Sequence, residues 1–109
     1  MSWPNWVRGL HPQLAPHFVE LVRVAQSVDP TVRVTSAKRS SAEQARLYRR
    51  SLAGVSRYPV APPGRSKHEQ GRAIDITGPD WLLRLLGEAW ERAGGRWGGR
   101  FNDPIHFEA

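Results

Sequence analysis

The sequence has 109 residues, a size that supports one hydrophobic core and therefore one domain. Its hydrophobic content of 39% and its five tryptophans argue against a disordered chain, while nine prolines and ten glycines predict many loops. The absence of cysteine excludes disulfides and thiolate metal sites, so any bound metal must be held by His, Asp and Glu side chains.

The net charge of +6 predicts an anionic partner. Nucleic acid, an anionic membrane and an anionic bacterial wall are all negatively charged and would fit. We expect no nucleic-acid binding, because the cations are scattered and no recognition motif is present. Residues 1–10 lack the apolar region of a signal peptide, and no apolar stretch is long enough to span a bilayer. We therefore expect a monomer made in the cytoplasm, without stable membrane insertion.

The first half of the chain predicts two helices and a strand. Apolar residues at helical spacing predict an amphipathic helix over residues 11–28. Residues 32–35 alternate as a strand does. Positions 40 and 43, or 41 and 44, then form a capping box that predicts a helix running to about residue 52.

The second half begins with a loop over residues 54–67, which is rich in proline and glycine. Residues 73–77 alternate and place Asp75 on the face opposite two isoleucines. A third helix begins near Pro79 and ends at the glycine pair 94–95. The apolar stripe of this helix is expected to comprise Trp81, Leu82, Leu85, Leu86, Ala89 and Trp90.

The last segment, residues 105–108, alternates again, with His106 and Glu108 on one face. The order of these elements predicts an α+β fold over residues 1–109, a single domain with a small antiparallel sheet and flanking helices. The polar residues of the two late strands would then meet on one face of that sheet.

Two short segments carry residues suited to metal binding. Six residues separate His68 from Asp75, too many for adjacent turns of one helix, so a loop and a strand would supply them. His106 would add a third ligand from a second strand. Three such ligands leave one position of a tetrahedral zinc open, as in catalytic sites. Zinc suits imidazole and carboxylate ligands best, although the same set can hold other divalent metals.

These segments also carry a family resemblance. Ser-x-His-x-x-Gly-x-Ala-x-Asp at residues 66–75, followed by Asp-x-x-His-Phe-Glu at residues 103–108, resembles the D-alanyl-D-alanine carboxypeptidase and L-alanyl-D-glutamate endopeptidase family. That family includes vancomycin-resistance carboxypeptidases and phage endolysins. Residues 36–48 and the Trp-Gly-Gly at 97–99 fit the resemblance as well. It implies a hedgehog/DD-peptidase-like fold and a zinc hydrolase, a metallopeptidase that cuts peptidoglycan stem peptides and takes part in cell wall degradation.

The resemblance also implies catalytic roles for individual residues. It places the catalytic carboxylate at Asp103, which would act as general base, although an Asp-Pro pair is also an ordinary start of a turn. Glu108 competes for the base role and is ranked second, as a residue that orients a ligand or binds the substrate's ammonium group. Arg39 matches the substrate-facing arginine of the family, which would stabilise an oxyanion or bind a substrate carboxylate.

Other residues have weaker claims. Ser66 and Gln44 are candidates for hydrogen bonds to the substrate, and Gln44 could equally do no more than cap its helix. Gly71 and Ala73 would leave room for backbone and substrate near the metal, or would form an ordinary turn and strand. Trp97 could line a groove, but a core position is the commoner arrangement for a tryptophan beside two glycines.

The missing signal peptide and the Asp at position 103 favour an endolysin-like L-Ala-D-Glu endopeptidase. Such an enzyme would act at the cell wall of bacteria, with peptidoglycan as its partner, after delivery by a phage-type system. The alternatives are a D-Ala-D-Ala carboxypeptidase and a non-catalytic module of the same fold that binds the wall or DNA.

Overall fold

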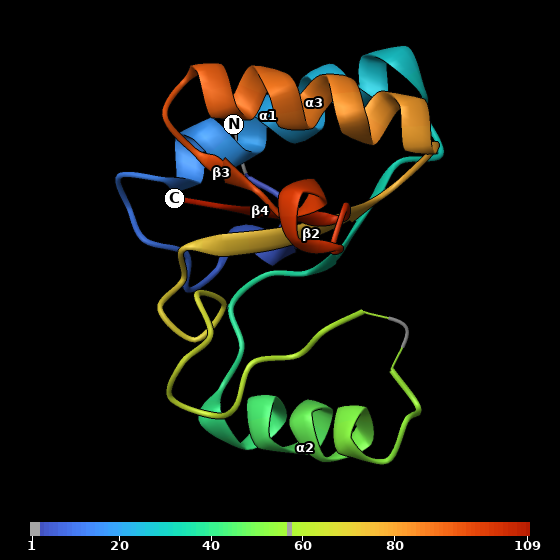
Figure 1. Ribbon diagram of the computed structural model, residues 1–109. Coiled ribbons are helices and arrows are strands. Elements are labelled where there is room, and N and C mark those ends of the chain that lie inside the picture. The colour runs from blue at the N-terminus through green and yellow to red at the C-terminus, as the bar shows by residue number, and fades with distance from the viewer. Residues whose placement is uncertain (1–2, 57) are drawn as a thin grey trace.

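A four-stranded antiparallel sheet is the centre of the structure, a computed structural model that describes residues 3–56 and 58–109 (Figure 1). Its strands follow the order β1-β2-β4-β3 across the sheet. They are β1 (Arg33–Ser36), β2 (Ala73–Thr77), β3 (Arg96–Trp97) and β4 (His106–Glu108). The predicted α+β class with a small antiparallel sheet is therefore confirmed.

Helices lie on both sides of this sheet. Figure 1 shows α1 (Ala15–Val28) and α3 (Asp80–Arg92) packed together over one face, while α2 (Ser41–Leu52) lies beyond the other face. Two short 3-10 helices, η1 (Asn5–Val7) and η2 (Gly98–Phe101), complete the order of elements. In the described part of the chain, no helix combines the length and apolar character that crossing a membrane requires.

The hydrophobic core fills the space between the sheet and the pair α1 and α3. Ile74, Ile76 and Phe107 are fully buried there, and the rings of Phe18 and Trp90 stack with their centroids 5.0 Å apart. Because side chains alternate along a strand, the residues between these core positions point to the opposite face of the sheet. That face looks toward α2.

The two N-terminal elements begin later than predicted. Helix α1 starts at Ala15 instead of residue 11, because residues 11–14 form a separate turn in which the N–H of Leu14 donates to the carbonyl of His11 at 2.9 Å. Strand β1 is shifted by one residue to 33–36. A β-bulge brings Ser36 opposite Asp75, whereas Val34 pairs with Ile76.

The predicted start of α2 is confirmed, with Ser40 as the N-cap. The hydroxyl of Ser40 accepts a hydrogen bond from the N–H of Glu43 at 3.1 Å, and the N–H of Ser40 donates to the Glu43 carboxylate at 3.2 Å. Of the residues in this helix, Gln44 alone is buried. The helix is therefore held in place mainly by polar contacts.

The predicted buried stripe of α3 is wrong in part. Trp81 and Leu85 are each 56% exposed, and Ala89 is exposed as well. The buried face comprises Leu82, Leu83, Leu86, Gly87 and Trp90. The helix is rotated because Gly87 lies against the ring of Trp97, where a β-carbon would come within 2.1 Å of the ring. Trp97 belongs to β3, a strand too short for an alternating pattern to predict.

The contact between Gly87 and Trp97 gives a test of this packing. Gly87→Ala should lower the free energy of unfolding by about 1–3 kcal/mol, because the added methyl group overpacks the ring. Leu85→Ala, on the exposed side of the same helix, should change it by less than about 1 kcal/mol. Urea unfolding of the two variants measures both values, and an equal effect would contradict the orientation of α3.

Candidate metal centre

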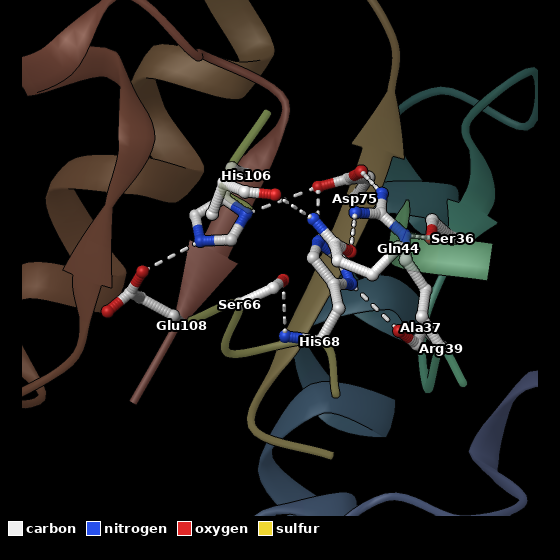
Figure 2. A network of polar contacts seen from close by, with 10 residues as sticks. Ser36, Ala37, Arg39, Gln44, Ser66, His68, Asp75, His106 and Glu108 are labelled. Carbon is white, nitrogen blue, oxygen red and sulfur yellow. Dashed lines mark hydrogen bonds and ion pairs between the residues drawn. The ribbon is translucent and has the colours of Figure 1, made fainter. Parts of the chain in front are cut away.

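Three buried side chains meet on the sheet face that looks toward α2 (Figure 2). Asp75 and His106 are direct partners across β2 and β4, so their side chains stand next to each other. His68 reaches them from the turn that precedes β2. The Oδ1 atom of Asp75 lies 3.1 Å from Nε2 of His68 and 3.3 Å from Nδ1 of His106. All three potential ligand atoms lie within 4.8 Å of one another.

The outer nitrogen of each imidazole is already bonded to the protein. Nδ1 of His68 lies 2.8 Å from the carbonyl of Ala37, and Nε2 of His106 lies 2.8 Å from the Glu108 carboxylate. Both partners are acceptors, so the outer nitrogens carry the protons. The inner nitrogens then direct lone pairs toward the Asp75 oxygen. Three acceptors at one point repel each other unless a cation or a proton lies between them, and the donor set therefore fits a divalent metal.

Arg39 binds the other oxygen of Asp75. Its Nη2 donates to Oδ2 of Asp75 at 2.9 Å, its Nε to the Ser36 hydroxyl at 2.8 Å, and its Nη1 to Oε1 of Gln44 at 3.1 Å. Gln44 in turn donates to the carbonyl of Ala61 at 2.7 Å. The predicted candidates Arg39 and Gln44 thus lie beside the three potential metal ligands, and Gln44 connects Arg39 to the loop after α2.

The ionisation of the cluster follows from its contacts. Burial of Asp75 favours the neutral acid. When protons lie between the three side chains, however, hydrogen bonds from His106 and His68 and the nearby charge of Arg39 hold the pKa of Asp75 well below its usual range. For His106, burial lowers the pKa, whereas the hydrogen bonds to Asp75 and Glu108 raise it, and the net shift is upward. The centre therefore favours positive charge between its ligands.

Asp103 lines the same cleft as the three potential ligands. Burial and the nearby Asp75 carboxylate raise the pKa of Asp103 to about 6. Among the described residues, its carboxylate has no hydrogen-bond partner. Its backbone is nevertheless held firmly, because its N–H donates to the carbonyl of Gly98 at 2.8 Å and its carbonyl accepts from the N–H of His106 at 3.0 Å.

Gly98 and Trp97 position this turn, a role that no local pattern in the sequence predicts. A β-carbon on Gly98 would come within 2.2 Å of the Asp103 carbonyl oxygen and 2.8 Å of the His106 β-carbon. The indole N–H of Trp97 donates to the carbonyl of Pro104 at 2.8 Å. Trp97 is buried, so of its two expected positions the core position is correct and the groove-lining position is wrong.

The loop that carries His68 is organised by Ser66 and Glu69. The Ser66 hydroxyl accepts from the N–H of His68 at 3.2 Å. The Glu69 carboxylate accepts from the N–H of Gly64 at 2.9 Å and from the Ser41 hydroxyl at 3.0 Å. Glu69 is not among the residues predicted from the sequence. A carboxylate that follows a glycine-rich loop with several free N–H groups was the available signal.

Gly71 allows a left-handed turn and a close approach of the backbone of residues 9–11, and it does not line the cleft. Its φ is +70°, and a β-carbon would lie 2.5 Å from the carbonyl oxygen of Gly9 and 2.9 Å from the N–H nitrogen of His11. The space expected at Gly71 is therefore filled by residues 9–11. Ala73 is buried and pairs with Glu108 across β2 and β4.

The metal centre opens into a cleft of about 670 Å³. One wall comes from α2 and the loop that follows it, and the other from the sheet and the segment around Phe101. The predicted site residues that line this cleft are Arg39, Gln44, Ser66, His68, Asp75, Asp103, His106 and Glu108. Residues far apart in the sequence thus line one cleft, in the region where the two motifs predict a common site.

The profile of the VanY D-alanyl-D-alanine carboxypeptidase family matches residues 7–107. The chain belongs to this family. VanY-family proteins are peptidases that act on peptidoglycan, and the His-Asp-His cluster is consistent with that activity. No curated protein sequence matches the chain.

Solved structures with the same fold include three peptidases. VanY of a VanB-type resistance cassette, solved as a mutant in complex with Zn(II), is 20% identical with a TM-score of 0.68, over 91% of this chain and 71% of that one. The LD-carboxypeptidase LdcB is 20% identical with a TM-score of 0.70, over 95% and 68%. The L-Ala D-Glu endopeptidase ChiX of Serratia marcescens is 27% identical with a TM-score of 0.61, over 94% and 81%.

The convergent acceptors give a direct prediction about metal content. The purified protein should bind about one zinc ion per chain, because the described residues contain one suitable ligand cluster. Asp75→Ala removes the oxygen that both imidazoles face and should weaken zinc binding by more than about 100-fold. Asp80→Ala, an exposed carboxylate on α3, is the matched control. Elemental analysis and zinc titration would contradict the centre if the two variants bound zinc equally.

Proposed function

We propose that residues 1–109 form a single zinc metallopeptidase domain that hydrolyses the L-Ala-D-Glu bond of peptidoglycan stem peptides. The observation that carries this proposal is the convergence of His68, Asp75 and His106 on one point, beside the carboxylate of Asp103, which no described residue hydrogen-bonds. Membership of the VanY family supports the reaction class. The Zn(II) complex of the related VanY structure supports the choice of metal.

The chain's own residues divide the work. His68, Asp75 and His106 hold the metal through the atoms that already face one another. A zinc ion held there supplies Lewis acidity to the scissile carbonyl and to the attacking water. The outer hydrogen bonds to Ala37 and Glu108 fix the orientation of both rings, so the site is arranged before the substrate arrives.

Asp103 is the proposed general base. It would take a proton from the attacking water and then deliver that proton to the amine that leaves. A general base works best when its pKa lies near the working pH. Burial and the nearby Asp75 carboxylate raise the pKa of Asp103 to about 6, which brings it closer to neutral pH. Because no described residue occupies its carboxylate, Asp103 is available to a water molecule in the cleft.

Arg39 is the proposed partner of the oxyanion or of a substrate carboxylate. A guanidinium has five N–H groups, and three of them are bonded to Ser36, Gln44 and Asp75. The two that remain, one on each terminal nitrogen, can donate to the substrate. Ser66 and Gln44 border the same cleft and are proposed to add weaker hydrogen bonds.

For Glu108 we propose an orienting role before a catalytic one. Its Oε1 accepts from Nε2 of His106, which commits that oxygen to a metal ligand. Its Oε2 lies 3.9 Å from Arg96 at the border of the cleft, where a substrate ammonium group would also meet it. The base role therefore stays with Asp103.

The choice of scissile bond rests on separate support. ChiX is an L-Ala D-Glu endopeptidase and is 27% identical to this chain, whereas the VanY structure is 20% identical. The second candidate is a D-Ala-D-Ala carboxypeptidase, which the description of the family and the D-alanine-D-alanine complex of VanYB favour. Monomeric action at the bacterial wall after phage-type delivery completes the proposal. A non-catalytic module is disfavoured because every catalytic position is filled.

The scissile bond can be identified from the products. The zinc-loaded protein should release peptide fragments from purified peptidoglycan that have D-Glu as their new N-terminus, while L-Ala becomes the new C-terminus of the other product. Mass spectrometry of the soluble fragments measures this result, and chelator-treated protein is the control. Release of single D-alanine residues instead would establish the carboxypeptidase, and the absence of any fragment would contradict a peptidase.

The separate roles of Asp103 and Glu108 can be tested by two matched amide substitutions. Asp103→Asn should keep its zinc but lose activity by roughly 100-fold or more, because the proton acceptor is gone. Glu108→Gln should have a milder effect, since an amide oxygen can still accept from His106. Stem-peptide hydrolysis and zinc content are measured together. Near-full activity of Asp103→Asn with an inactive Glu108→Gln would transfer the base role to Glu108.

A further inference from the structure

The cleft contains more positive charge than its own carboxylates balance. Its lining includes five cations and three carboxylates: Arg39, Arg50, Arg65, Lys67 and Arg96, with Asp75, Asp103 and Glu108. Two of the cations are paired within the protein. Arg39 binds Asp75 at 2.9 Å, and Arg96 lies 3.9 Å from Glu108 and over the ring of Phe101.

The other three cations have no such partner. Among residues 3–56 and 58–109, no hydrogen bond or ion pair reaches the side chain of Arg50, Arg65 or Lys67. The carboxylates closest in sequence are already committed, because Glu69 accepts from backbone N–H groups of its own loop and Glu43 caps α2. The excess charge is therefore not a by-product of local pairing.

These three cations lie on one wall of the cleft. Arg50 is in the last turn of α2, and Arg65 and Lys67 belong to the segment that returns from α2 to His68 (Figure 1). Unpaired like charges on one wall repel each other and disfavour the folded chain slightly. A bound anion removes that repulsion, so the arrangement suits a ligand that carries a negatively charged group outside the scissile amide.

We propose that Arg50, Arg65 and Lys67 form a carboxylate-binding subsite that selects stem peptides by an acid group outside the scissile bond. The inference deepens the proposed function and rests on it for the class of substrate. A stem peptide offers two such groups, the free α-carboxylate of a γ-linked D-glutamate and the carboxylate at its C-terminus. Both present the same chemistry to a guanidinium or an ammonium group.

The experiment compares three peptides that differ by one charge. The parent is L-Ala-γ-D-Glu-L-Lys-D-Ala, and each of the other two carries an amide in place of one carboxylate. Binding is measured by calorimetry on zinc-loaded Asp103→Asn protein, in which turnover during the titration is slowed by the loss of the proposed base. Amidation of the recognised carboxylate should weaken binding roughly tenfold, and amidation of the other carboxylate should change it little.

Variants of the three cations test whether they are responsible for the charge-dependent binding. Arg50→Gln, Arg65→Gln and Lys67→Gln, each added to the Asp103→Asn protein, should weaken binding of the parent by about two- to fivefold. The triple variant should bind the parent and the amidated peptide equally. The matched control is Arg92→Gln, which removes the same charge from the exposed C-terminal end of α3, outside the cleft. It should leave binding unchanged.

The possible results separate this inference from the function beneath it. Equal binding of all three peptides, or an equal loss in Arg92→Gln, would overturn the subsite and leave only general attraction by net charge. Hydrolysis of the parent peptide by the wild-type protein is followed separately by mass spectrometry. Charge-dependent binding without hydrolysis would overturn the proposed peptidase activity and support the subsite. Hydrolysis together with equal binding of the three peptides would support the peptidase activity and overturn the subsite. The unfolding midpoint of each variant verifies that it is folded.

Discussion

The meeting of two imidazole nitrogens and one carboxylate oxygen at a single point is the constraint on which the rest of the site depends. Acceptors repel one another, so the protein must hold them by other bonds. It does so from outside, through the Ala37 carbonyl, the Glu108 carboxylate and the guanidinium of Arg39. Each of these contacts uses the atom that does not face the metal position. The arrangement therefore leaves three lone pairs for one cation.

The sheet supplies both the core and the site, because alternate residues of the same strands serve each. On β2, Ile74 and Ile76 pack under α1 and α3 while Asp75 between them faces the cleft. On β4, Phe107 enters the core between His106 and Glu108. A shift of register by one residue would exchange the two sets. The packing of the core thus also fixes which face carries the ligands.

This double use explains what the sequence could predict. Alternation identifies Asp75 and His106 as neighbours on one face, and the capping box identifies the start of α2 at Ser40. The buried side of α3 could not be read from its apolar residues, since Gly87 turns toward Trp97 and leaves Trp81 and Leu85 exposed. Contacts between distant segments, such as those of Gly98 with the turn before β4, have no local pattern. Those contacts position the proposed base.

The two walls of the cleft are stabilised in different ways. The sheet side is anchored by the core, whereas α2 buries Gln44 alone and is held by polar links such as those from Gln44 to Arg39 and to Ala61. Segments with few buried apolar contacts open at lower cost than core strands. Residues on the α2 wall can therefore change with little effect on the potential metal ligands, apart from Gln44, which acts on Asp75 through Arg39. The three cations for which the described residues provide no partner lie on that outer wall, so substitutions there change the lining of the cleft and leave the candidate ligands in place.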